Sequence, residues 1–202
     1  MVPTQPVFYY DLGAPRCYLL AETIMSTLPV VPEWEPVLAA NLSTPVDLAN
    51  KSDRLEIERL AAKYGLQPIR WPATWPPDTT TAMLAATYAK RIGRGVAFSL
   101  AAFRQAFAGG RDLGDEDTVL IAGAACEMHP TALRKGIDLA GTEAALAEAN
   151  QRALAAGVSQ LPAIQVGSRV FMGTDVITPA SAALATRPPQ AALVNKPPPN
   201  TP

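Results

Sequence analysis

The segments that favour β-structure lie at the two ends of this chain of 202 residues. The segment 30–38 contains Pro32 and Pro36, which predict an edge strand or an irregular strand there. Gly167-Ser168 is a hairpin signal between the last two β-favouring segments, 163–166 and 169–172. The predicted strands are Val7–Tyr10, 30–38, Ala163–Val166 and Arg169–Met172. Any sheet must therefore be assembled from segments that are far apart in the sequence.

The chain between these segments favours helices. Proline is favoured at the first helical position, so Pro15 predicts a helix that continues through residues 17–28. The prolines of residues 69–78 exclude a helix there. The further predicted helices are 52–64, 80–92, 96–107, one capped by Asp115 that ends at His129-Pro130, a short helix or turn at 131–137, one capped by Thr142 that ends at Gly157, and 179–185.

The order of elements is β-α-β, a block of helices, then α-β-β-α. Without the block this is the thioredoxin arrangement. A Leu161-Pro162 pair stands directly before the predicted hairpin, where that fold places a cis-proline opposite the first helix. We therefore expect an α/β protein with a thioredoxin-like fold and a helical insertion domain. The expected parts are 1–40 and 139–185 for the thioredoxin-like domain, 41–138 for the insertion and 186–202 for a Pro-rich disordered tail.

The composition leaves few reactive side chains. The 17 basic and 18 acidic residues give a net charge of −1, which lacks the basic surplus of a nucleic-acid-binding protein. The 2 cysteines and 1 histidine are too few for a structural zinc site of four cysteines or of two cysteines and two histidines. We expect neither a metal nor a nucleic-acid partner.

The first residues, MVPTQPVFYYDLG, show neither the basic nor the apolar region of a signal peptide. No apolar run is long enough to span a bilayer, and the most apolar stretch, 118–126, has acidic neighbours and predicts a buried helix. We therefore expect a cytoplasmic protein without a membrane partner, whose cysteines are reduced.

Two stretches resemble one family. FYYDLGAPRCYLLAE (residues 8–22) is similar to the first motif of the DsbA-like thioredoxin-fold proteins, above all of the branch with 2-hydroxychromene-2-carboxylate isomerase and kappa-class glutathione transferase. GVSQLPAIQVGSRVFMGTD (residues 157–175) resembles the cis-proline segment and closing Gly-x-Asp of the same family. The resemblance covers the chain up to about Ala185.

The resemblance implies an oxidoreductase or isomerase that binds glutathione or another low-molecular-weight thiol and acts on a small, aromatic or electrophilic substrate. Ala14 occupies the place of the family's leading Ser or Cys, and Cys17 occupies the second place of the motif. A phenol near the site, above all that of Tyr10, could donate a hydrogen bond to a thiolate. The thiol-binding residues that the resemblance implies are Pro15, Arg16, Leu161, Pro162, Thr174 and Asp175.

Several of these residues also have plainer interpretations. Cys17 lies near a helix N-terminus beside Arg16, where a thiol pKa falls, or it is a small buried residue. Asp175 binds an ammonium group or caps a turn. Tyr10 is either a hydrogen-bond donor or a packing residue. Cys126 and His129 are three residues apart, as in an activated nucleophile, but a core cysteine and a histidine at a helix end are also expected there.

The function has alternatives as well. Ala14 has no nucleophile, so the chain is either a thiol-dependent enzyme or a catalytically impaired member that keeps a pocket for a small molecule or a partner. Trp71 and Trp75 line an apolar substrate pocket or pack in the core. The apolar helices of residues 80–107 carry more apolar surface than one domain needs, which makes a homodimer the third possibility.

Overall fold

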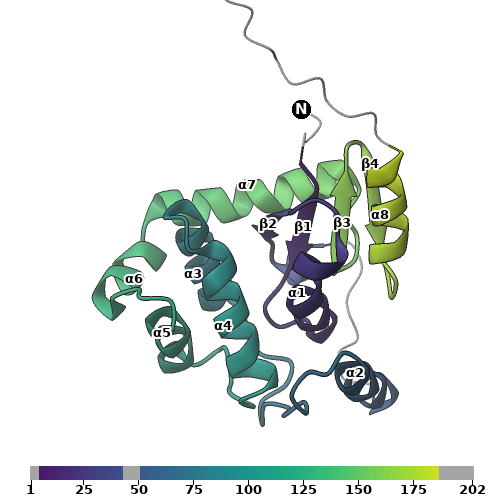
Figure 1. Cartoon of the computed structure of the whole chain (residues 1–202). Coiled ribbons are helices and arrows are strands. Elements are labelled where there is room, and N and C mark those ends of the chain that lie inside the picture. The colour runs from purple at the N-terminus through teal and green to yellow at the C-terminus, as the bar shows by residue number, and fades with distance from the viewer. Residues whose placement is uncertain (1–4, 43–50, 187–202) are drawn as a thin grey trace, which may run out of the picture.

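A computed structural model describes residues 5–42 and 51–186 of the chain. Its sheet has four strands in the order β2-β1-β3-β4 (Figure 1). β1 pairs in parallel with β2, and β3 pairs antiparallel with both β1 and β4. The strands are β1 (Val7–Tyr10), β2 (Glu33–Pro36), β3 (Ala163–Val166) and β4 (Arg169–Met172). The sheet is thus built from both ends of the chain, as predicted, and β2 is shorter than the predicted 30–38.

The helices confirm the thioredoxin-like α/β fold with a helical insertion. The connection between β2 and β3 contains the inserted helices, and the last of them, α7, lies along one face of the sheet (Figure 1). The helices are α1 (Pro15–Thr27), α2 (Lys51–Lys63), α3 (Thr80–Arg91), α4 (Gly95–Phe107), α5 (Glu116–Ala124), α6 (Pro130–Ile137), α7 (Ala140–Ala156) and α8 (Ile177–Ala185), with a 3₁₀ turn η1 (Ala39–Asn41) after β2. The proposed tail, 187–202, lies outside the described residues, and the boundaries of the parts stay predictions.

Three helix ends test the predicted caps. The Asp115 carboxylate accepts a hydrogen bond from the backbone N–H of Asp117, which confirms this cap. The predicted end of the same helix at His129 is wrong, because α5 ends at Ala124 and the chain turns through Glu127 at a φ of 62°. Thr142 is not a cap either: α7 begins at Ala140, and the Thr142 hydroxyl donates to the carbonyl of Gly136.

The register of β1 positions the candidate site. Tyr9 lies opposite Ala163 of β3, the residue that follows Pro162. The turn after β1 and the proline before β3 therefore lie at the same end of these two central, antiparallel strands. Successive side chains of a strand point to opposite faces. Phe8 and Tyr10 accordingly pack against Trp34 on one face, while Tyr9 points to the other.

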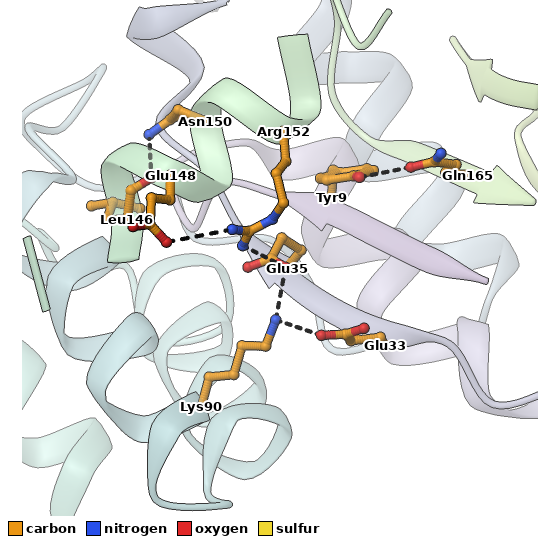
Figure 2. Close-up of polar contacts among 9 residues, drawn as sticks. All are labelled: Tyr9, Glu33, Glu35, Lys90, Leu146, Glu148, Asn150, Arg152 and Gln165. Atoms are coloured by element: carbon orange, nitrogen blue, oxygen red, sulfur yellow. Dashed lines mark hydrogen bonds and ion pairs between the residues drawn. The ribbon is translucent and has the colours of Figure 1, made fainter. Parts of the chain in front are cut away.

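An ion-pair cluster holds helices of the insertion to the sheet (Figure 2). The Glu35 carboxylate of β2, whose side chain is 10% exposed, contacts Lys90 of α3 at 2.8 Å and Arg152 of α7 at 3.3 Å. Glu33 contacts the same Lys90 ammonium at 2.8 Å, and the Tyr9 hydroxyl donates to Gln165 beside the cluster. One buried carboxylate thus joins three elements that lie apart in the sequence.

The apolar helices of residues 80–107 are covered within the chain. Phe98, Phe103 and Phe107 of α4 are fully buried, whereas Ile92, which follows α3, and Val96, in the first turn of α4, remain exposed. This burial removes most of the apolar excess that favoured a dimer, and the homodimer stays a prediction. In the described residues, 5–42 and 51–186, no helix is long and apolar enough to cross a membrane.

Candidate functional site

The turn between β1 and α1 is fixed by a buried carboxylate. Asp11 accepts hydrogen bonds from the backbone N–H groups of Gly13 and Ala39, both at 2.8 Å, and from the Thr79 hydroxyl at 3.3 Å. Burial raises the pKa of Asp11, although these hydrogen bonds oppose the shift. The bond from Gly13 closes the turn itself, and the bonds from Ala39 and Thr79 tie the turn to η1 and to the start of α3.

α1 begins at this turn without a side-chain cap. Ala14 is the N-cap residue and makes no capping hydrogen bond through its side chain, and Pro15 follows in the first turn. The N–H groups of a first helical turn carry partial positive charge. The start of α1 therefore favours a nearby anionic group, and the N-cap residue Ala14 has no side-chain group of this kind.

The thiol of Cys17 lies in the interior. Its exposed fraction is 0%, and burial raises the pKa of the Cys17 thiol well above its ordinary value, with the charge of Asp11 adding to the rise. Burial thus acts against the lowered pKa that the first interpretation of Cys17 requires. The geometry favours the second interpretation of Cys17, a small residue packed in the core.

Tyr10 also lies in the core. Its ring is fully buried against Trp34 and Phe103, and its hydroxyl shares a 2.6 Å hydrogen bond with Ser99 of α4. Burial raises the pKa of Tyr10 above its ordinary value. This hydroxyl already has a partner inside the protein, so the packing interpretation of Tyr10 is favoured over a donor to a bound thiolate.

A groove of about 410 Å³ runs between α1, the end of α2 and the start of α8. It brings together four of the residues implied by the family resemblance, namely Arg16, Pro162, Thr174 and Asp175. The peptide bond between Leu161 and Pro162 is cis, as predicted. The remaining predicted site residues are buried and do not line the groove; they are Tyr10, Ala14, Pro15, Cys17 and Leu161.

The charged side chains of the groove are partly paired. Arg16 donates to Glu56 of α2 at 2.8 Å, and about a quarter of its side chain is exposed. Asp175 accepts a hydrogen bond from the backbone N–H of Thr178, so it has the turn-capping role considered from the sequence. Its carboxylate is nevertheless exposed in the groove. Both interpretations of Asp175 are therefore compatible with the geometry.

The sequence reasoning missed the contribution of α2. Leu60, Lys63 and Tyr64 line the groove opposite α8, because α2 packs Ile57 and Ala61 into the core. The one available signal was the spacing of these two residues on one helical face.

A second cavity, of about 480 Å³, lies beside the other face of α1. Tyr18, Glu22 and Arg104 line it, and Arg104 forms two hydrogen bonds with the Glu22 carboxylate, at 2.7 and 2.8 Å. This ion pair is satisfied within the chain. The cavity therefore offers no charge that needs a ligand.

The Trp71 and Trp75 rings meet edge to face at 5.3 Å, and both contact Phe107. Neither tryptophan lines the groove or the second cavity, so the interpretation as core packing is favoured. The Trp75-Pro76 peptide bond is also cis, which the sequence reasoning did not predict.

Cys126 and His129 do not form a nucleophile pair. The Cys126 thiol donates to the carbonyls of Ala122 and Gly123, and Nδ1 of His129 accepts a hydrogen bond from the backbone N–H of Thr131 at the start of α6. Within residues 5–42 and 51–186, no group of three or more His, Cys, Asp or Glu side chains is placed to hold a metal ion.

Known structures share this fold. A 2-hydroxychromene-2-carboxylate isomerase aligns with a TM-score of 0.77 at 17% identity, over 89% of this chain and 94% of the other. A probable DsbA oxidoreductase from Streptomyces coelicolor aligns with a TM-score of 0.72 at 17% identity, over 93% of each chain. The cytosolic disulfide reductase DsbM from Pseudomonas aeruginosa, in a structure with GSH, aligns with a TM-score of 0.64 at 16% identity, over 90% of this chain and 97% of the other.

At these identities the likeness establishes the fold alone, and no curated protein matches the sequence. The sequence model of the DSBA-like thioredoxin domain, however, matches residues 7–185, which span the whole sheet and all the described helices. The chain therefore belongs to the DsbA-like thioredoxin domain family.

Proposed function

We propose that this protein binds a low-molecular-weight thiol, such as glutathione, in the groove beside α1 and uses the sulfur of that thiol to isomerise a small electrophilic substrate. The observation that carries the proposal is that the residues lining the groove are not the residues of the cysteine motif. The groove presents Arg16, Pro162 and Asp175, whereas Cys17 is buried and Ala14 has no reactive group. The nucleophile must then come with the ligand.

The charges of the groove suit a thiol peptide. Glutathione carries two carboxylates and one ammonium group. Arg16 and Lys63 provide the positive charges for the carboxylates, and the exposed carboxylate of Asp175 provides a partner for the ammonium group. Arg16 uses one nitrogen, Nη2, for its contact with Glu56, so other N–H groups of the guanidinium remain for a ligand.

The start of α1 supplies the electrostatic part of the reaction. A sulfur bound in the groove beside Arg16 and Pro162 lies near the N-terminal end of α1, which no side chain caps, and the positive charge of that end favours the thiolate. The thiolate adds to one carbon of a conjugated C=C bond, and the electron pair of that bond moves to the conjugated oxygen. Rotation about the resulting single bond and return of the electron pair expel the thiolate, so the substrate is isomerised without net oxidation.

A dithiol exchange mechanism fits the structure less well. Exchange needs an attacking thiolate and a resolving thiol. The two cysteines of the chain are free and buried, and burial raises the pKa of both thiols. The names of two proteins of the same fold agree with a bound thiol as the reagent: one is an isomerase of 2-hydroxychromene-2-carboxylate, and DsbM was solved with GSH.

A second candidate function is thiol binding without turnover. Ala14 favours it, because this residue has no hydroxyl or thiol that could donate a hydrogen bond to the thiolate. Thiol-dependent turnover of an electrophilic alkene separates the two functions. Turnover by the natural sequence supports the isomerase. Turnover that appears only in Ala14→Ser assigns the natural protein to the binding function.

Calorimetric titration with glutathione tests the site itself. We expect binding by the natural protein and a loss of roughly tenfold or more in affinity in Arg16→Ala, because a charge-assisted hydrogen bond is removed. Arg134→Ala is the matched control, since it also breaks a surface Arg–Glu ion pair, with Glu116, but lies outside the groove. The site assignment fails if no thiol binds, or if Arg16→Ala and Arg134→Ala bind glutathione equally well.

A further inference from the structure

The groove is longer than a three-residue thiol. Along α1 its lining residues run from Arg16 to Thr27. Eleven residues of helix span about 16 Å. A fully extended α-linked tripeptide reaches at most about 11 Å, and the γ-linkage of glutathione adds only two methylene groups to that length. A ligand held by Arg16 and Pro162 near the start of α1 therefore leaves the part of the groove near Thr27 unfilled.

The walls of this groove combine aliphatic side chains with the hydroxyl groups of four threonines. Thr23, Thr27, Thr174 and Thr178 line it. The Thr23 hydroxyl donates to the carbonyl of Leu19, and the Thr27 hydroxyl donates to that of Thr23, so the oxygens of both remain acceptors. An alkyl chain laid against these groups would remove them from water without replacing their hydrogen bonds. A ligand with hydroxyl groups of its own would replace them.

The opposite wall offers an aromatic surface. Tyr64 is 46% exposed, and it lies at the end of α2 one turn after Leu60. Both side chains line the groove across from the threonines of α1. A sugar ring is complementary to such a surface, because it presents an apolar C–H face to an aromatic ring and hydroxyl groups at its edge.

We infer that the thiol ligand of this groove carries a sugar or a similar polyol, which lies along α1 between Tyr64 and Thr27. The inference rests on the proposed function, since it specifies the thiol that the site takes. Arg16 and Pro162 hold the thiol-bearing part. The threonine hydroxyls and the ring of Tyr64 select the hydroxylated part.

Calorimetry with two matched thiols tests the inference. N-acetylcysteinyl-glucosamine and N-acetylcysteine methylamide have the same thiol and differ in the sugar. We expect the full-length protein to bind the glucosamine compound roughly tenfold more tightly, as two or three additional hydrogen bonds would give. This advantage, the difference in affinity between the two thiols, should fall to about threefold or less in Tyr64→Ala and in Thr27→Val. Both substitutions change exposed residues.

Thr186→Val is the control, because its hydroxyl also donates to a carbonyl of its own helix but lies at the other end of α8, outside the groove. It should keep the full advantage. Equal affinity of the natural protein for the two thiols overturns the inference, as does an advantage that survives in both Tyr64→Ala and Thr27→Val. A parallel titration with glutathione shows which hypothesis has failed. If glutathione binds and Arg16→Ala weakens its binding, only the inference of a sugar fails. If no thiol binds, the proposed function fails as well.

Discussion

Cys17 lies one turn into α1, where the helix dipole and the apolar surroundings act on its thiol in opposite directions. The dipole favours a thiolate, but the side chain is fully buried and its pKa rises. The position of Cys17 in the motif could be read from the sequence. Its burial could not, because it depends on how segments that are distant in the sequence pack together. The turn before Cys17 is an example: a methyl group built on Gly13 would lie 2.7 Å from the side chain of Thr79.

We expect Cys17 and Cys126 to be inert in the folded protein. Both thiols are buried and have raised pKa values, so at about pH 8 few thiolates form and little reagent reaches them. Iodoacetamide followed by mass spectrometry should modify neither cysteine of the native protein and both in guanidinium chloride. Rapid modification of Cys17 in the native state would show that its thiol is reactive, contrary to this account.

The same raised pKa makes stability depend on alkaline pH. The unfolded chain releases the thiol protons near pH 8.5, while the folded chain keeps them to higher pH. The free energy of unfolding should therefore fall as the pH rises above about 8.5, and urea titrations should show a smaller fall in Cys17→Ala.

Tyr9→Phe is the control, because Tyr9, whose pKa burial raises to about 12, has an ordinary value near 10 and contributes only at still higher pH. A natural protein whose stability is constant between about pH 8.5 and 10 would be inconsistent with the burial of Cys17.

At the scale of elements, the Glu35 cluster couples the sheet to α3 and α7 (Figure 2). Glu35→Gln keeps the shape of the side chain but leaves Lys90 and Arg152 without its charge. We expect the free energy of unfolding to fall by about 1–3 kcal/mol, because hydrogen bonds between charged groups are lost at a largely buried position. Urea denaturation measures the change.

Glu148→Gln is the control for this prediction. Glu148 meets the same Arg152 at 3.8 Å, but its side chain is 69% exposed. Exposed pairs contribute little, so the change should stay within about 0.5 kcal/mol. Equal effects of Glu35→Gln and Glu148→Gln would mean that the cluster is a solvated surface network and does not hold the insertion in place.

The elements show which local signals are sufficient. The local runs are enough to predict β1, β3 and β4, whereas the prediction of the cis bond at Leu161-Pro162 rests on the thioredoxin-like order of elements and not on the pair itself. Thr142 shows the limit. A threonine ahead of an acidic residue predicts a cap, but here its hydroxyl bonds to Gly136 of the preceding helix, and that contact depends on how α6 and α7 pack.

For the whole molecule, the fold follows from the order of elements, whereas the groove does not. Its wall at Lys63 and Tyr64 depends on how α2 packs against α1. No local pattern in residues 60–64 indicates that these residues face α1. The burial of Phe98, Phe103 and Phe107 within one chain is likewise a property of the assembled helices. The sequence therefore predicts the fold that positions the site better than it predicts the residues that line the groove.

The central claim is that the reactive sulfur belongs to a bound thiol and not to the protein. The most direct measurement uses the Cys17→Ala/Cys126→Ala variant, which has no thiol of its own. Ultraviolet absorbance of the thiolate, followed during a pH titration with bound glutathione, reports the pKa of the ligand thiol. We predict that the variant binds glutathione like the natural protein and lowers this pKa relative to free glutathione. Loss of binding in the variant, or a bound thiol with the pKa of the free one, would contradict the account.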